Sequence, residues 1–178
     1  GMSAHTILIN YINTKNMDNY KIYIGIDPGA KGYLAIYDGV AWAHCPLADT
    51  DQCITLLESA AQYKCVAVVE DVHAMPRQGV ASTFNFGYNV GTVIGWLQAL
   101  HIPYHQVTPR KWQGAMWERK DKVIVSGKAD AKRTSLNCAR RLLPDMDWRR
   151  TPKCKVADDN KIDATLLCMY AMQTYQLI

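Results

Sequence analysis

The sequence predicts a single α/β domain whose central β-sheet is covered by helices on both faces. Two short segments, Ile22–Ile26 and Cys65–Val69, are apolar at nearly every position, as strands buried under helices on both sides are. Apolar residues recur at helical spacing in segments 54–61 and 162–170. The chain has 178 residues, of which 49% are hydrophobic and 20% charged, as expected for one globular domain.

This domain is expected over residues 20–178. Residues 1–19 are mostly polar, and Gly1 before Met2 is typical of a tag remnant, so we expect an N-terminal arm there. No apolar run approaches the ~20 residues that span a bilayer, so no membrane segment is predicted. The six cysteines show no zinc-type spacing, which predicts buried free thiols in a reducing cytoplasm.

The first half of the chain is expected to begin with a β-hairpin. The strands Ile22–Ile26 and Tyr33–Tyr37 flank a turn that contains Pro28 and two glycines, and a third strand is expected over Val40–Cys45. A helix capped by Asp49 follows, and the apolar strand after it ends in Glu70.

A loop over 72–81 and a helix over 82–101 are expected next, with Ser82 as a possible cap. In this helix Gly87, Gly91 and Gly95 recur every four residues on one face. Because glycine costs a helix interior roughly 1 kcal/mol relative to alanine, the stripe indicates close approach of another backbone. Packing on the sheet is the simpler explanation, and contact with a second subunit is the alternative.

The second half alternates basic connections with helices. The segments expected here are a strand (102–107), a short helix opened by Thr108-Pro109, a polar loop (118–130), a helix (131–143), a polar connection (145–156) and a last helix from about residue 158. Segment 110–155 carries fourteen Lys or Arg against five acids, whereas the rest carries six bases and eleven acids. This asymmetry suggests a polyanionic partner beside a site that needs carboxylates, although a basic surface can also serve solubility alone.

Acidic residues stand at three points where the pattern is otherwise apolar. Asp27 and Glu70 each end a buried strand, and Asp163 directly precedes the apolar run of the last helix. Asp27 before Pro-Gly is also common turn chemistry, and the helix dipole alone accounts for Asp158 and Asp159 at a helix start. Asp159 and Asp163 are four residues apart, so they share one helical face and require a cation.

Such carboxylates are the oxygen ligands that Mg²⁺ or Mn²⁺ prefers. Two ions about 3.5–4 Å apart can activate water and stabilise the leaving oxygen of a phosphodiester. The basic segment would then hold a nucleic-acid backbone across the acids.

Four motifs in order give a more specific resemblance: Ile-Gly-Ile-Asp-Pro-Gly (24–29), Val-Val-Glu-Asp-Val-His-Ala-Met-Pro (68–76), Val-Thr-Pro-Arg-Lys-Trp (107–112) and Asp-Asp-Asn-Lys-Ile-Asp-Ala (158–164). Together they resemble the RuvC family of Holliday-junction resolvases, particularly its phage-type members, over roughly residues 20–175. The resemblance implies an RNase H-like fold with a mixed five-stranded sheet flanked by helices on both faces. It also implies a homodimer in the cytoplasm of a bacterium or phage-infected cell, which nicks four-way DNA junctions using Mg²⁺.

The resemblance also implies catalytic metal ligands. They are Asp27, Glu70, Asp163 and one earlier acid of the last helix. Family members often place that ligand three residues before the last one, at the position of Asn160 here, whereas phage-type spacing gives Asp159. We prefer Asp159, with Asp158 as its substitute.

DNA-binding residues are expected in two places. Lys128, Lys132 and Arg133 are the candidates for backbone contacts, although they also suit a solvated helix face. The family places residues after the second acid against the junction centre, where this chain has His73, Met75, Arg77, Phe84 and Phe86. Apolar packing is an equal alternative for the two Phe residues.

Three other functions compete with junction resolution. The same chemistry can act on other branched DNA or on RNA–DNA hybrids, and an inactive junction-binding protein can keep the fold. Sugar kinases and actin-like ATPases share the opening Asp-x-Gly turn, but they need a second domain and a second phosphate loop.

Overall fold

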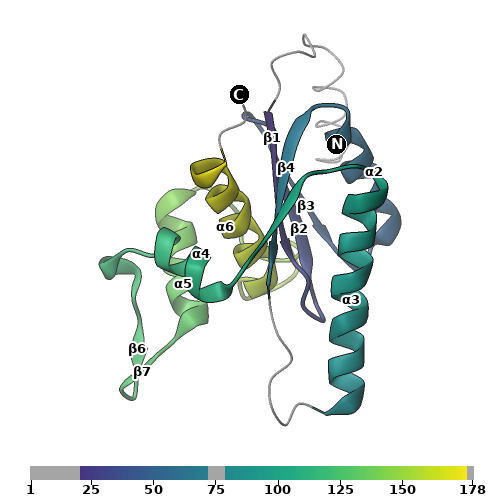
Figure 1. Ribbon diagram of the computed structural model, residues 1–178. Helices are drawn as coiled ribbons and strands as arrows, with labels where there is room; N and C mark the ends of the chain where they lie inside the picture. The colour runs from purple at the N-terminus through teal and green to yellow at the C-terminus, as the bar shows by residue number, and fades with distance from the viewer. Residues whose placement is uncertain (1–20, 72–78, 176–178) are drawn as a thin grey trace.

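The computed structural model describes residues 21–71 and 79–175 (Figure 1). The arm expected over residues 1–19 lies outside these ranges, as do His73, Met75 and Arg77. The strands of the main sheet are β1 (Lys21–Asp27), β2 (Tyr33–Tyr37), β3 (Trp42–Pro46), β4 (Lys64–Glu70) and β5 (Tyr104–Val107). Their order is β3-β2-β1-β4-β5.

The sheet is mixed, as predicted. β1 pairs antiparallel with β2 and parallel with β4, and β4 pairs parallel with β5. β1 is therefore hydrogen-bonded on both sides, and its residues Ile22, Ile24 and Ile26 are fully buried. Parallel pairing brings Ile26 opposite Val69, so Asp27 and Glu70 finish neighbouring strands at the same edge of the sheet.

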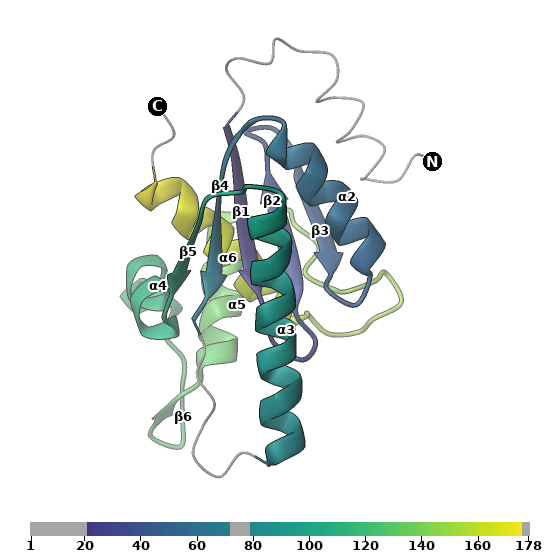
Figure 2. The same cartoon turned by 45° about the vertical axis from the view of Figure 1, so that its right-hand side comes forward.

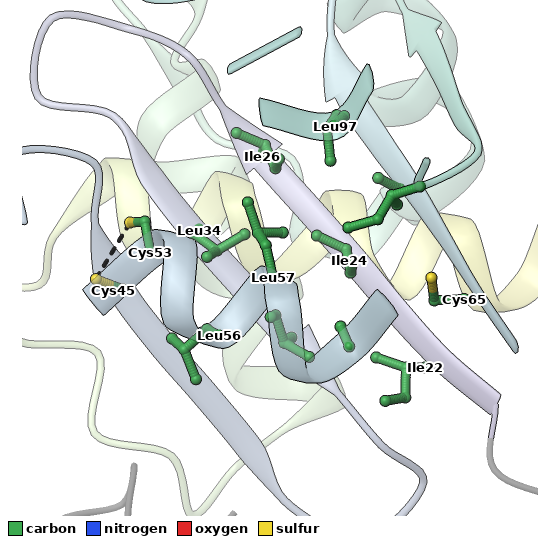
Figure 3. Close-up of a cluster of buried hydrophobic side chains, with 14 of the residues drawn as sticks. Ile22, Ile24, Ile26, Leu34, Cys45, Cys53, Leu56, Leu57, Cys65 and Leu97 are labelled. Carbon is green, nitrogen blue, oxygen red and sulfur yellow. Dashed lines mark hydrogen bonds between the residues drawn. The ribbon is translucent and has the colours of Figure 1, made fainter. Parts of the chain in front are cut away.

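Helices cover both faces of the sheet (Figures 1 and 2). The helices are α2 (Thr50–Ala61), α3 (Val80–Ala99), α4 (Pro109–Met116), α5 (Ala131–Leu142) and α6 (Asp159–Thr174). Residues of α2 and α3 pack with one face of β1 and β4 in one apolar cluster, part of which Figure 3 shows. Residues of α4, α5 and α6 form the second cluster, with Val68 and Val107 of the sheet.

α6 packs on β1 at very short range. A Cβ atom added at Gly25 would come within 3.0 Å of the carbonyl oxygen of Ala164 and of the backbone nitrogen of Cys168. Only glycine fits there, because the obstructing atoms belong to the helix backbone and cannot swing aside. This contact fixes the height of α6 along β1 and therefore where its acids lie.

Of the two helix starts for which a cap was predicted, one is confirmed and one differs. The side chain of Asp49 accepts a hydrogen bond from the backbone nitrogen of Gln52, which confirms the predicted cap of α2. α3 instead begins after Gly79, two residues earlier than expected, so Ser82 lies inside the helix and is not its cap.

The segment expected to be a loop, 118–130, contains regular structure. It forms a short 3₁₀ helix, η2 (Arg119–Asp121), followed by a hairpin of β6 (Ile124–Val125) and β7 (Lys128–Ala129). The turn between the strands is Ser126-Gly127, and both residues have positive φ angles of 49° and 75°. Such a two-residue turn matches the twist of a hairpin.

The glycine stripe of α3 does not pack on the sheet, so the simpler explanation given above is wrong. A Cβ atom at Gly87, Gly91 or Gly95 would meet nothing within 4 Å. The side chains of Val93 and Leu97, on the opposite side of the helix, are the ones buried against the sheet. Within residues 21–71 and 79–175, the glycine face of α3 is therefore open.

All six cysteines are free thiols, and five of them are buried, with Cys154 half-buried. The thiol of Cys53 contacts that of Cys45 at 3.3 Å inside the core (Figure 3). Within the two described ranges, no helix is long and apolar enough to cross a membrane.

Candidate active site

Asp27 is a buried carboxylate at the carboxyl end of the central strand. It is 8% exposed, and its Oδ1 accepts a hydrogen bond of 2.9 Å from the backbone nitrogen of Gly29. Burial raises its pKa; the Gly29 hydrogen bond lowers it less, and the nearby charge of Asp158 raises it further. Asp27 thus makes the turn contact that its sequence context suggests, and the hydrogen bond from Gly29 does not offset the effect of burial on its pKa.

Glu70 ends β4 beside Asp27 and is held by an indole. The Nε1 of Trp112, a fully buried residue of α4, donates a hydrogen bond of 2.8 Å to Oε1 of Glu70. Burial raises the pKa of Glu70 to about 7; the indole hydrogen bond lowers it, and the charge of Asp27 raises it. Because Trp112 is buried, it is not available to stack on a base.

Asp163 lies on the first turns of α6, next to the residues that pack on Gly25. Its Oδ1 is buried and receives no hydrogen bond from any residue in the described part of the chain. Burial raises its pKa to about 8; a hydrogen bond from Ser135 lowers it, and the charges of Asp27, Glu70 and Asp159 raise it. The carboxylates of Asp27, Glu70 and Asp163 are thus close enough to repel one another.

The two acids at the start of α6 have different partners. Asp159 forms an ion pair of 2.8 Å with Lys132 of α5, and its side chain is 39% exposed. Asp158 caps α6, accepting hydrogen bonds from the backbone nitrogens of Asn160 and Lys161, and its other oxygen accepts one from Arg150. Burial raises the pKa of Asp158, but these hydrogen bonds outweigh it and lower the pKa. Lys132 therefore supplies the cation that the Asp159 and Asp163 pair was expected to need.

The chemistry of this acid cluster fits a hard divalent cation. Its candidate ligands are all carboxylate oxygens. The charge of Asp27 raises the pKa of Glu70, and the charges of Asp27 and Glu70 raise that of Asp163, whose buried Oδ1 has no partner among the described residues. Within residues 21–71 and 79–175, however, no three His, Cys, Asp or Glu side chains lie close enough to form a ready-made metal centre. The acid cluster therefore fits a divalent cation in the type and charge of its side chains, and not through a ready-made coordination geometry.

A hollow of about 580 Å³ adjoins the turn after Asp27. It lies between that turn, the loop from β3 to α2, and α3. Lys31 and Arg150 bring positive charge to it, while Leu47, Val93 and Trp96 give it an apolar part. Arg150 also donates a hydrogen bond to the carbonyl oxygen of Lys31, which ties the segment before α6 to the hairpin turn.

The residues predicted to bind DNA fall into two groups. Lys128 belongs to β7, and Lys132 and Arg133 to the first turn of α5; all three are exposed. Phe84 is 71% exposed on the first half of α3. His73 and Arg77 lie in the segment that the structure does not describe.

Sequence reasoning missed two residues that shape this site. Trp112 orients Glu70 from a position 42 residues later in the chain, and the sequence carries no signal for that pairing beyond the motif that contains it. Gly25 did carry a signal, since an isolated glycine inside a buried strand is typical of close backbone approach.

Comparisons with known proteins agree with this architecture. Residues of this chain match the Thermus thermophilus RuvC structure in complex with a Holliday-junction substrate, with a TM-score of 0.52, 13% identity, and coverage of 87% of this chain and 96% of that one. A second T. thermophilus RuvC structure matches with a TM-score of 0.47, 13% identity, and coverage of 85% and 95%. No protein-family model and no curated protein matches the chain. At this identity the likeness shows the fold, which is the RNase H-like fold with a mixed five-stranded sheet.

Proposed function

We propose that this protein is a metal-dependent, structure-selective DNA endonuclease that resolves four-way junctions by hydrolysing phosphodiesters. The observation that carries the proposal is that three like-charged carboxylates, of buried Asp27 and half-buried Glu70 and Asp163, lie near one another at one edge of the sheet. Two of them end neighbouring parallel strands, and the third comes from the helix that packs on β1. This is the arrangement that a hard cation would stabilise.

The proposed metal ligands are Asp27, Glu70, Asp163 and Asp159, with Asp158 as the substitute for Asp159. Among the described residues, Asp159 is half-exposed and pairs with a surface lysine alone, whereas both oxygens of Asp158 are engaged in capping and with Arg150. This difference supports Asp159. Bound Mg²⁺ or Mn²⁺, two ions per site in this proposal, lowers the pKa of water and stabilises charge on a phosphodiester.

The chain's own residues have separate tasks in this proposal. Trp112 holds the Glu70 carboxylate in place, and Lys132 holds Asp159. Lys128, Lys132 and Arg133 of the basic segment contact DNA phosphates, with His73, Arg77 and Phe84 nearer the branch point. Phage-type membership of the RuvC family and a cytoplasmic location in a bacterium or phage-infected cell belong to the same proposal.

The partner in the proposed homodimer is a second copy of this chain, seated on the open face of α3. Val80, Phe84 and Tyr88 are exposed by 89%, 71% and 67%, and helical spacing puts them on the same face as Gly87, Gly91 and Gly95. The open glycines allow a second helix to approach closely, and the large apolar side chains beside them would be buried by that contact. Two chains would provide two acid clusters, one for each of the paired nicks.

Incubation with synthetic DNA tests the proposal. A four-way junction, a fork and an RNA–DNA hybrid are each incubated with the protein and Mg²⁺, and the cut positions are mapped. We expect paired nicks in the junction, little cleavage of the other two, and no cleavage of any by Asp27→Asn, which should still bind. Equal cleavage of all three would favour the broader nuclease activity, and binding without cleavage would favour an inactive junction-binding protein.

A further inference from the structure

The β6–β7 hairpin stands in solvent on both of its faces. Ile124 and Val125 are adjacent in β6, so their side chains point to opposite faces of the two-stranded ribbon, yet they are 62% and 43% exposed. Neither face therefore packs on the rest of the domain. An isolated two-stranded hairpin is marginally stable in water, so this one must be held by its base.

That base is fixed firmly to α5. The backbone nitrogen of Val123 donates a hydrogen bond to the hydroxyl of Thr134, and its carbonyl accepts one from the backbone nitrogen of Asp130. Just before it, the buried carboxylate of Asp121 accepts hydrogen bonds of 2.9 and 2.7 Å from the guanidinium of Arg141. The base of the hairpin is thus held rigidly against α5, whereas the side chains of Ile124 and Val125 remain outside the core.

The tip lies at the same end of the molecule as the acids. In both views the hairpin and the first turns of α3 lie toward the lower end of the molecule, which is also the end at which β1 and β4 finish (Figures 1 and 2). β7 leads within three residues into α5, whose Lys132 pairs with Asp159. The hairpin is thus joined by one short segment to the candidate active site.

Positive charge flanks the exposed apolar residues of β6. Lys122 precedes β6 and Lys128 begins β7; both are exposed, and neither forms an ion pair with any residue in ranges 21–71 and 79–175. Exposed Ile124 and Val125 between these two cations are complementary to nucleic acid, where phosphates lie on both sides of apolar base faces.

We propose that the β6–β7 hairpin is a wedge that inserts Ile124 and Val125 at an open base step of branched DNA. Lys122 and Lys128 contact the phosphates on either side. Apolar side chains of this kind unstack base steps in other DNA-binding proteins, and the energetic cost is least where stacking is already interrupted, as at a branch point. The inference rests on the proposed function for its DNA substrate, and it adds the element that recognises the branch.

The test uses the full chain carrying Asp27→Asn, so that cleavage does not alter the DNA. The wedge variant is Ile124→Ser with Val125→Ser, and the matched control is Val40→Ser with Val156→Ser, which changes two exposed valines elsewhere. Binding is measured to a four-way junction with 2-aminopurine at the branch and to linear duplex. Because all four side chains are exposed, both variants should fold, which circular dichroism verifies.

We expect the wedge variant to lose the 2-aminopurine fluorescence increase and about tenfold in junction affinity, with duplex affinity almost unchanged. Lys122→Gln with Lys128→Gln should lower the slope of log affinity against log salt by about 2. Unchanged fluorescence and junction affinity in the wedge variant would overturn the inference. So would conversion of an oligomer to monomer with unchanged DNA binding, which would assign the tip to protein contact.

These outcomes are distinct from failure of the proposed function. A protein without the Asp27→Asn change that binds and unstacks the junction but never cuts it would refute the nuclease and keep the wedge. Cutting by the protein without the Asp27→Asn change, together with normal branch fluorescence in the wedge variant, would refute the wedge and keep the nuclease.

Discussion

The carbonyl oxygen of Ala164 lies so close to Gly25 that α6 and β1 meet backbone to backbone. This contact places the first turns of α6, and Asp163 with them, beside the carboxyl end of β1. The candidate active site therefore depends on a residue that has no side chain.

Gly25→Ala should destabilise the protein by about 3 kcal/mol or more, because the added Cβ must push the α6 backbone away. Urea denaturation measures the free energy of unfolding. Gly114→Ala is the matched control, because a Cβ atom added at Gly114 would meet no described residue within 4 Å and alanine favours a helix interior by up to about 1 kcal/mol. Equal effects of the two substitutions would contradict the packing described for β1.

Asp163→Asn should stabilise the metal-free protein at alkaline pH while it abolishes cleavage. The substitution removes a charge whose pKa is raised to about 8, chiefly by burial, and a gain of about 1 kcal/mol is expected at pH near 8.5. Near pH 5 the gain should vanish, since Asp163 is then protonated.

The control for this variant is Asp121→Asn, which changes another buried acid. Asp121 is paired with Arg141, and the guanidinium hydrogen bonds hold its pKa below the ordinary value. Its substitution should cost about 3 kcal/mol at either pH, because it leaves Arg141 without its partner charge. Loss of stability in Asp163→Asn at pH 8.5 would show that the charge on Asp163 is compensated in the folded protein.

Metal-free protein should become less stable as pH rises from about 5 to 8.5. Burial raises the pKa of Glu70 from 4.5 to about 7 and that of Asp163 from 3.8 to about 8. The folded protein therefore binds more protons than the unfolded chain in this window, so stability present at the low end is lost as pH rises through the folded values. Thermal melts across the window measure the fall.

Mg²⁺ should reverse that fall at pH 8.5 and change little at pH 5, because only the ionised carboxylates bind it. At a hundred times its Kd, a ligand stabilises the folded state by about 2.7 kcal/mol, or several degrees in Tm for a chain of this size. A melting temperature that does not change when Mg²⁺ is added at alkaline pH would rule out the proposed metal ligands.

Trp112→Phe should move the acidic limb of the pH–rate profile for cleavage upward by about one pH unit. The indole hydrogen bond lowers the pKa of Glu70, and a phenyl ring keeps most of the packing without the donor. Trp148→Phe is the matched control, since the Nε1 of Trp148 is buried without a hydrogen-bond partner in the described residues. The same profile shift in both variants would mean that loss of packing causes it.

Gly91→Glu should convert the proposed dimer to monomers, because it puts a charge on the open apolar face of α3. Sedimentation velocity measures the oligomeric state. Gly114→Glu is the control, since Gly114 lies on α4 with equally open space around it. A monomeric parent protein, or a dimer that survives Gly91→Glu, would refute the dimer contact.

Much of this fold could be predicted because its signals are local. Continuous apolar runs predicted the buried strands, and the acids that end them singled out Asp27 and Glu70 as candidate ligands, which the structure places at the ends of neighbouring parallel strands. Asp163 was predicted from the apolar run that follows it. The catalytic roles of these acids remain predictions.

What could not be predicted depends on contacts between distant segments. The bond from Trp112 to Glu70 exists because α4 starts where β5 ends, one strand away from β4, and no local pattern encodes it. The ion pair of Lys132 with Asp159 likewise joins two helices. The β6–β7 hairpin is different, since Ser126-Gly127 between apolar and basic residues is a turn signal that the polar surroundings obscured.

The hydrogen bond between Trp112 and Glu70 also gives the protein an internal optical reporter. Trp112 is fully buried, and its indole nitrogen touches one carboxylate of the candidate site. A change in the charge or partners of Glu70 alters the electric field at that ring, and hence its emission. The difference in intrinsic fluorescence between the parent chain and Trp112→Phe therefore isolates a signal from within the acid cluster, without any attached dye.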